Sequence, residues 1–367
     1  MKLLLLLIST FSLVCVYAQK NDVPVVVNLD GYTTDQKIKV PFRAIKVVDA
    51  RFDRSNIGCV NKSASQTSFK HQKTTAVFPQ PLEQYLPGLF SSLLAFDPEA
   101  QDTLLMLVKQ FRVTDHLFNG INLQYEPEVL LKISTSFFKL QNRQLIKLFS
   151  IDDVLSEKWP SNLILNNERM VEFRNDGLFT LLQTLFTKKN WLPNGISFPS
   201  SALENGLRKR FQLPLYIDTV LRAGVYRNFR EFKENSPSIK NVQIQKRGNL
   251  VTGVWDSTGK LLDLKKIWGV CDGEKRYIVF RNDFCELVPS DKTFRFFSYT
   301  QAKDLSGQAG YGDYATQNGL LGAAIIKAMD NPINREYFYL NMDEEEVHLE
   351  ELFGRSRLNS LQKELLK

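Results

Sequence analysis

Alternating apolar and polar positions dominate the second half of the chain and predict a run of antiparallel strands. After Pro237, strand-like stretches recur between short groups of turn-forming residues. These turn signals are Gly248-Asn249, Ser257-Thr258-Gly259, Asp272-Gly273, Asn282-Asp283 and Ser290-Asp291. Their spacing is typical of an antiparallel meander, in which neighbouring strands are joined by hairpins.

Two short helices are expected before this meander. Asn228 and Glu231 lie three residues apart, so each side chain can satisfy a backbone N–H of a first helical turn. Pro237 then ends the helix, because the residue before a proline avoids the helical conformation. Ser201 and Glu204 form the same capping pattern at the start of a helix that is predicted to end at Phe211.

The first half has a different pattern, in which strands alternate with longer helices. Val40–Phe52 is its strongest predicted strand, and apolar residues on both faces as far as Val48 indicate a central, covered strand. Residues 128–152 alternate on both sides of Gln141-Asn142 and predict a long hairpin. Further strands are expected at Val25–Leu29 and Leu104–Val113, helices at Leu82–Phe96 and Met170–Phe186, and a polar loop at Ser55–Thr75.

This order of elements predicts the α+β class. We expect an N-terminal α+β layer domain over residues 19–195, followed by a domain of short helices and a mainly antiparallel β-meander over residues 196–342. The tail, residues 343–367, starts with four acidic residues and continues with apolar residues on one side, which predicts an amphipathic helix. Such a helix packs on its own domain or docks on a partner.

The N-terminus has the pattern of a secretory signal peptide. Lys2 precedes an apolar core and a Val-Tyr-Ala sequence, so we expect cleavage after Ala18 and a mature chain in the periplasm or outside the cell. The alternative is a lipoprotein signal with Cys15 as the acylated residue. A transmembrane helix is not expected, because the apolar run is shorter than the roughly 20 residues that a span requires.

Two stretches of the second half carry a resemblance to a known group of proteins. Residues 224–239 read G-V-Y-x-x-F-x-E-F-x-x-N-x-P-S-I, and residues 268–278 read W-G-V-C-D-G-x-x-x-Y-I. Both resemble segments of uncharacterised exported proteins of Bacteroidota bacteria. Those proteins have no established activity, so the resemblance implies export and a similar domain layout but no catalytic residue.

Charge and motif content argue against several functions. Removing Lys2 with the signal lowers the net charge from +7 to +6, and the basic residues occur in small separate groups that indicate solvated faces and not a nucleic-acid site. The histidines, His71, His116 and His348, have no metal-ligand spacing, and C-x-x-C and G-x-S-x-G motifs are missing. The glycines of residues 307–322 match no phosphate-binding pattern. We therefore expect neither a cofactor nor a metal.

One group of charged residues is a weak candidate binding site. Asp49, Arg51 and Asp53 lie at the end of the strand predicted over residues 40–52, and alternation places all three on one side of the chain. Functional residues often lie at strand ends in open sheets. The alternative is an internal ion pair that fixes the end of the strand.

The cysteines left after cleavage, Cys59, Cys271 and Cys285, are expected to be reduced. With Asp272-Gly273 and Asn282-Asp283 as two-residue turns, Cys271 lies opposite Glu274 and Cys285 lies opposite Phe280. The two thiols would then be much farther apart than a disulfide allows.

Together these features favour an exported cell-envelope protein that acts as a binding or assembly-accessory module. Its expected partner is a protein or another envelope component. The alternative is a carboxylate-dependent hydrolase of an envelope or dietary polymer, since paired carboxylates can act as acid and base. Two carboxyl groups that converge in a deep cleft would favour the enzyme.

Overall fold

The computed structural model describes residues 23–62, 73–118, 125–159, 166–187, 189–193, 197–248, 250–299, 335–343 and 346–349. The predicted signal peptide with Cys15, the glycine-rich residues 307–322 and tail residues 350–367 lie outside this part of the chain.

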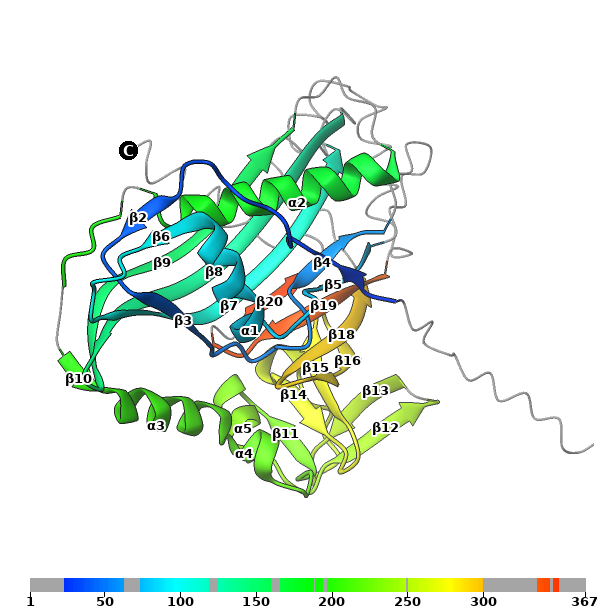
Figure 1. The fold of residues 1–367 in the computed structure, drawn as a ribbon. Helices are drawn as coiled ribbons and strands as arrows, with labels where there is room; N and C mark the ends of the chain where they lie inside the picture. Colours follow the sequence, from blue (N-terminus) through cyan, green and yellow to red (C-terminus); the bar gives the residue numbers. More distant parts are fainter. Residues whose placement is uncertain are drawn as a thin grey trace, which may run out of the picture.

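Three long antiparallel strands form the centre of the first half (Figure 1). They are β7 (Thr103–Phe118), β8 (Tyr125–Gln141) and β9 (Gln144–Lys158). The sheet continues in the order β1-β5-β4-β7-β8-β9-β10, and β3 pairs with β7 beside this path. The shorter strands are β1 (Val25–Val26), β3 (Ala44–Asp49), β4 (Gly58–Asn61), β5 (Lys73–Val77) and β10 (Ser197–Pro199).

Helices α1 (Leu82–Leu93) and α2 (Asn167–Thr184) share one hydrophobic core with this sheet. The apolar stripe predicted for α1 is buried, with Leu86 and Phe90 fully withdrawn from solvent. A smaller core on the opposite sheet face joins Leu105 and Leu107 to helix α3 (Ser200–Phe211). Two short strands, β2 (Ile38–Val40) and β6 (Leu94–Phe96), pair in parallel beside the main sheet.

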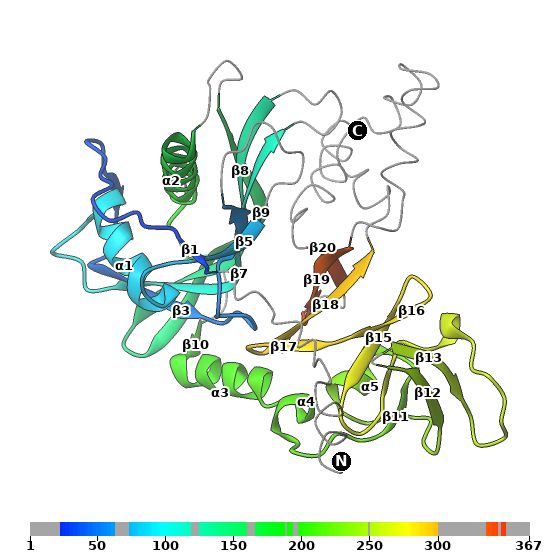
Figure 2. The ribbon, with the colours of Figure 1, turned by 90° about the vertical axis from the view of Figure 1, so that its right-hand side faces the viewer.

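The second half consists mainly of antiparallel sheets (Figure 2). One has the order β11-β14-β15-β16 and another β17-β18-β19-β20, while β12 and β13 form a separate hairpin. The strands are β11 (Gly224–Tyr226), β12 (Gln243–Arg247), β13 (Leu250–Trp255), β14 (Gly269–Cys271), β15 (Arg276–Phe280), β16 (Asp283–Glu286), β17 (Val288–Ser290), β18 (Thr293–Tyr299), β19 (Arg335–Asn341) and β20 (Glu346–Leu349). Helices α4 (Pro214–Ile217) and α5 (Phe229–Lys233) and a 3-10 turn (Leu264–Lys266) connect them.

The α+β class and most predicted elements are confirmed. The Asn228 side chain accepts a hydrogen bond from the backbone N–H of Glu231 at 3.0 Å, so α5 begins where the capping pattern predicts. The Glu231 carboxylate in turn accepts a hydrogen bond from the backbone N–H of Arg227 at 2.8 Å. The predicted long hairpin is β8–β9.

Several expectations were wrong in detail. Strand β3 pairs only with β7 among the described strands, so it is not a central strand. Its end is still covered on both faces, because Val47 and Ala50 belong to different hydrophobic cores. Residues 58–61, expected in a loop, form buried strand β4. Helix α3 follows Pro199 without a side-chain cap, so the Ser201–Glu204 capping pair does not form.

The tail and the turn positions also differ from the expectation. Residues 346–349 form strand β20 against β19 and do not continue a helix from the acidic residues. The β8–β9 hairpin turns at Asn142-Arg143, one residue later than expected, with both residues at positive φ as a two-residue hairpin turn requires. Hydrophobic alternation fixes which residues face the core but tolerates such shifts in the turn itself.

Candidate functional site

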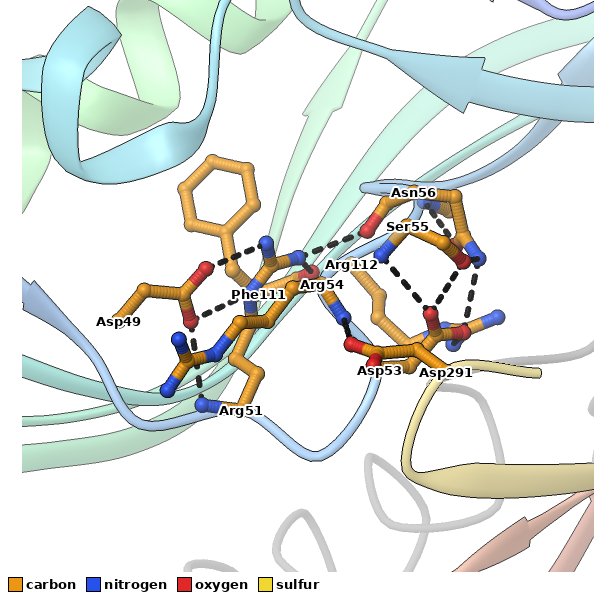
Figure 3. A network of polar contacts seen from close by, with 10 residues as sticks. Asp49, Arg51, Asp53, Arg54, Ser55, Asn56, Phe111, Arg112 and Asp291 are labelled. Atoms are coloured by element: carbon orange, nitrogen blue, oxygen red, sulfur yellow. Dashed lines mark hydrogen bonds and ion pairs between the residues drawn. The ribbon is translucent and has the colours of Figure 1, made fainter. Parts of the chain in front are cut away.

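The end of β3 contains a buried ion pair between two of the three predicted site residues (Figure 3). Arg51 donates to Asp49 through two of its guanidinium nitrogens, with Nε–Oδ1 at 2.9 Å and NH2–Oδ2 at 2.8 Å. Its NH1 atom donates to the carbonyl of Asn56 at 2.7 Å. Each side chain of the pair is about nineteen-twentieths buried. The internal ion pair that the sequence offered as an alternative is therefore present.

Asp53 is not part of this ion pair but is linked to it through Asn56. Its Oδ1 accepts from the N–H and hydroxyl of Ser55 at 3.1 and 2.6 Å, and its Oδ2 accepts from the Asn56 amide at 2.8 Å. Arg112 of β7 approaches the same carboxylate at 3.7 Å. The three predicted residues therefore lie in one polar network, but Asp53 does not share the ion pair, because β3 and its strict alternation end at Asp49.

The segment that carries these residues also joins the two halves of the chain. Phe52 is buried in the core of the second half, where its ring lies 5.5 Å from that of Phe211. The carbonyl of Phe52 accepts from the N–H of Lys292 at 3.0 Å, and the N–H of Arg54 donates to Asp291 at 3.0 Å. Residues 52–54 therefore form a junction between the large sheet and the β17–β18 turn.

Arg210 of α3 completes this junction. Its guanidinium stacks over the Phe52 ring at 4.1 Å and donates to the carbonyl of Ala50 at 3.1 Å. The same guanidinium forms an ion pair with Asp343, which follows β19. Since Arg210 joins α3 to residues 50–52 and to Asp343, it holds the junction closed around Phe52.

Tyr216 packs against Phe52 at the same junction. Its hydroxyl donates to the carbonyl of Lys292. Burial raises the pKa of Tyr216 above its ordinary value; nearby Arg210 opposes this shift, while the Asp291 and Asp343 carboxylates add to it. The phenol is therefore held protonated and serves as a hydrogen-bond donor.

A cavity of about 50 Å³ lies between the large sheet and the β17–β20 sheet. Its walls combine apolar groups with five charged side chains. They are Arg51, Phe52 and Asp53 after β3; Lys109, Gln110, Phe111 and Arg112 of β7; Thr293 of β18; and Tyr339, Leu340, Asn341, Met342 and Asp343 at the end of β19. The Arg112 guanidinium lies over the Tyr339 ring at 4.3 Å and so spans the two sheets beside the cavity.

Sequence reasoning missed most of this wall. Lys109, Gln110 and Arg112 fall in a predicted buried strand, and only their polar character within an apolar run signalled a special position. The residues of β19 lie more than 200 positions away, and nothing in the pattern of a single sequence brings them to β7. Of the two predicted carboxylates, Asp53 lines the cavity, whereas Asp49 is paired with Arg51.

A second buried pair, Asp115 with Arg174, was also missed. Arg174 occupies a core-facing position in α2 between Met170 and Leu178, so a charged residue within an apolar stripe was the available signal. No group of three or more His, Cys, Asp or Glu side chains suited to a metal occurs in the described ranges. Within the same ranges, no helix is long and apolar enough to cross a membrane.

Comparison with known proteins gives only distant likenesses. No protein-family model and no curated protein matches the sequence. Among solved structures, a protein from Xanthomonas campestris with the family label DUF330 aligns at 13% identity and a TM-score of 0.25, covering 51% of this chain and 98% of its own. A structure described only as an uncharacterized protein aligns at 15% identity and a TM-score of 0.21, covering 41% and 96%. These scores are too low to support an argument about function.

Proposed function

We propose that this chain is an exported cell-envelope protein that binds a protein or another envelope component and catalyses no reaction. Export is supported by the N-terminal sequence, in which Lys2, an apolar core and a Val-Tyr-Ala site follow one another. Binding is supported by the junction between the large sheet and the β17–β20 sheet.

The observation that carries the proposal is that the buried carboxylates at this junction accept hydrogen bonds from neighbouring side chains. Both oxygens of Asp49 accept from Arg51, and both oxygens of Asp53 accept from Ser55 or Asn56. A polymer hydrolase needs two carboxyl groups that face each other across the substrate, one of them able to give up a proton. Carboxylates that are hydrogen-bonded in this way to their own neighbours instead stabilise the conformation of the surface at the junction.

The cavity adds groups that remain available to a partner. Lys109 lines the cavity, is exposed to solvent and forms no ion pair with a residue in the described ranges. A charged group beside apolar walls is a common arrangement for orienting a bound group. This supports the junction as the contact site.

The proposal is tested by crosslinking in the native cell. A photoreactive residue placed at Lys109 should capture a defined partner that mass spectrometry identifies, whereas the same residue at Lys147, exposed on β9, should not. Capture from both positions alike, or from neither, would contradict binding at this junction.

Export has a test of its own. Intact-mass measurement on protein from the soluble envelope fraction should give a chain that starts at Gln19. A chain that retains residues 1–18, or a lipid on Cys15, would contradict this part of the proposal.

A further inference from the structure

We infer that the outer face of the β12–β13 hairpin binds a pyranose ring of a polysaccharide, with Trp255 as the stacking surface and the amides of Gln243 and Gln245 as polar contacts. This site is separate from the junction and goes beyond the proposed function, since it names a sugar polymer as a second ligand. Figures 1 and 2 both show the hairpin on the side of the second half that is turned away from the large sheet.

Pairing and burial define the two faces of the hairpin. Val254 of β13 is buried in a hydrophobic core that also includes residues of β14, β15 and β16. Neighbouring side chains of a strand point to opposite faces, so Gly253 and Trp255 face away from this core. Gln243 lies directly opposite Trp255, in a part of the hairpin that is regular. Gln245 lies opposite Gly253, so both glutamines share the outer face, and both are exposed there.

The indole of Trp255 lies flat on the strand. Three consecutive atoms of its six-membered ring, Cζ3, Cη2 and Cζ2, lie 2.7, 2.5 and 3.2 Å from the point where a Cβ atom of residue 253 would be. Distances this similar place that point over the face of the ring and not at its edge. Gly253 is buried on an otherwise exposed face because the ring covers it. A side chain at this position would push the ring away, so glycine is required here.

The other face of the same ring is the one that a ligand can reach. Trp255 is partly exposed and belongs to none of the four hydrophobic cores of the described residues. The backbone of Gly253 occupies one side of the indole, which leaves the opposite side for a contact. Leu261 forms a β-bridge with Trp255 and is 57% exposed, so it extends the apolar surface. The hairpin therefore presents an aromatic face in a fixed orientation.

The groups around the ring match a sugar. A pyranose of the glucose type carries hydroxyl groups around its rim and C–H bonds on its faces. Its faces therefore stack on an aromatic ring, whose negative π face attracts C–H groups. The rim hydroxyls need partners that both donate and accept hydrogen bonds, and a carboxamide does both. Gln243 and Gln245 supply two such groups beside the ring, and their amides form no hydrogen bond with a residue in the described ranges.

A proline-rich segment is the other common ligand of an exposed tryptophan, but it fits this face less well. Such segments dock in grooves lined by several aromatic rings. Here one ring lies on the flat face of a hairpin, and the nearest cross-strand side chains are amides. Proline has no N–H group, so a proline-rich segment would leave the amide oxygens of Gln243 and Gln245 without donors.

The test titrates the mature full-length protein with cellohexaose, chitohexaose and hexaproline, and follows tryptophan fluorescence and heat release. Both glycans consist of glucose-type rings, and chitohexaose adds N-acetyl groups. We expect saturable binding of at least one glycan and no binding of hexaproline. The glycan that binds more tightly then shows whether the natural ligand is a plain or an N-acetylated polymer.

Variants assign the binding to this face. Trp255→Ala should weaken glycan binding about tenfold, and Trp255→Phe, which keeps a smaller ring, should lose less. Gln245→Ala removes one amide from an exposed position and should weaken binding about threefold. Phe297→Ala is the control, because that ring is 46% exposed on β18, and it should bind like the unchanged protein. Circular dichroism verifies that each variant is folded.

Three results would overturn the inference. They are a folded protein that binds neither glycan, a glycan affinity that Trp255→Ala leaves unchanged, and binding of hexaproline in place of the glycans. Crosslinking from position 109 reports on the junction alone, so the proposed function stands or falls separately.

Discussion

The guanidinium of Arg174 lies 2.8 Å from the carboxylate of Asp115, and both side chains are almost completely buried. Arg174 also donates to the carbonyl of Asn61 at 2.7 Å, while Asp115 accepts from the backbone N–H of Asn61 at 2.7 Å. The pair therefore joins helix α2 to strands β4 and β7 across the main core. It fixes where the helix lies on the sheet that lines the cavity.

Breaking this pair should strongly destabilise the protein. Arg174→Met leaves the Asp115 carboxylate buried without its cation, which costs about 3–5 kcal/mol of unfolding free energy. Denaturant unfolding followed by circular dichroism measures the loss. The double variant Arg174→Met with Asp115→Leu is the control and should recover part of it, because no charge is then left buried. A single variant as stable as the unchanged protein would show that the pair contributes little.

Arg51→Ala should be destabilising for the same reason. It removes both hydrogen bonds to the buried Asp49 carboxylate and should lower the unfolding free energy by about 3–5 kcal/mol. Arg43, exposed in the same part of the chain, provides the control, and Arg43→Ala should stay within about 0.5 kcal/mol. If Arg51→Ala melts normally and loses crosslinked partners, the predicted binding role of this residue is correct and the structural role is not.

Local features of the fold could be read from the sequence because they depend on neighbouring residues. The cap at Asn228, the apolar stripe of α1 and the β8–β9 hairpin each need only a few consecutive positions. Hairpin registers were less accurate. The β15–β16 hairpin turns at Arg281-Asn282, one residue before the expected position, since several adjacent residues there tolerate positive φ.

The candidate site could not be predicted in the same way because its parts are distant in sequence. Asp53 was found from its place after a strand, but its neighbour Arg112 and the facing Tyr339 depend on how two sheets meet. The tail shows the same limit: four acidic residues favour a helix start locally, yet residues 346–349 pair with β19. A strand partner that is already in place outweighs a local helix preference.

Phe52 should be an anchor between the two halves of the chain. Phe52→Ala empties a buried position in the second core and removes the surface on which Arg210 stacks, so we expect a loss of about 3–5 kcal/mol. Phe297→Ala is the matched control, since that ring is 46% exposed and its loss should be much smaller. Equal losses in chemical denaturation would argue against the anchoring role.

Stability should fall in alkaline solution because of two buried tyrosines. Burial raises the pKa of Tyr216 and of Tyr226 above the ordinary value of 10.0. The folded state then holds protons that the unfolded chain releases, so this contribution is complete below pH 10.0 and is lost progressively as the pH rises above it. Unfolding free energies measured between about pH 8 and 11 should show this decline. Tyr216→Phe should make the decline shallower, and an unchanged slope would contradict the assignment to Tyr216.

Cys271 and Cys285 should remain thiols even in an oxidising compartment. Both are buried and form no disulfide in the structure, and the same holds for Cys59. The expected register was wrong, because Asp272 accepts from the N–H groups of Glu274 and Lys275 and makes a four-residue turn. Cys271 therefore lies opposite Arg276, and Cys285 lies opposite Ile278.

The corrected register still keeps the two cysteines apart. They are offset by two residues along β15, roughly 7 Å, and lie two strands apart, roughly 10 Å. A disulfide requires Cα atoms within about 7 Å, so the sheet would have to open before one formed. Burial also raises the pKa of the Cys271 thiol, which lowers its fraction of reactive thiolate. Thiol labelling should therefore be slow in the folded protein and should find three thiols per mature chain after unfolding without reductant. A count of one, rising to three after reduction, would mean that β14–β16 pair differently.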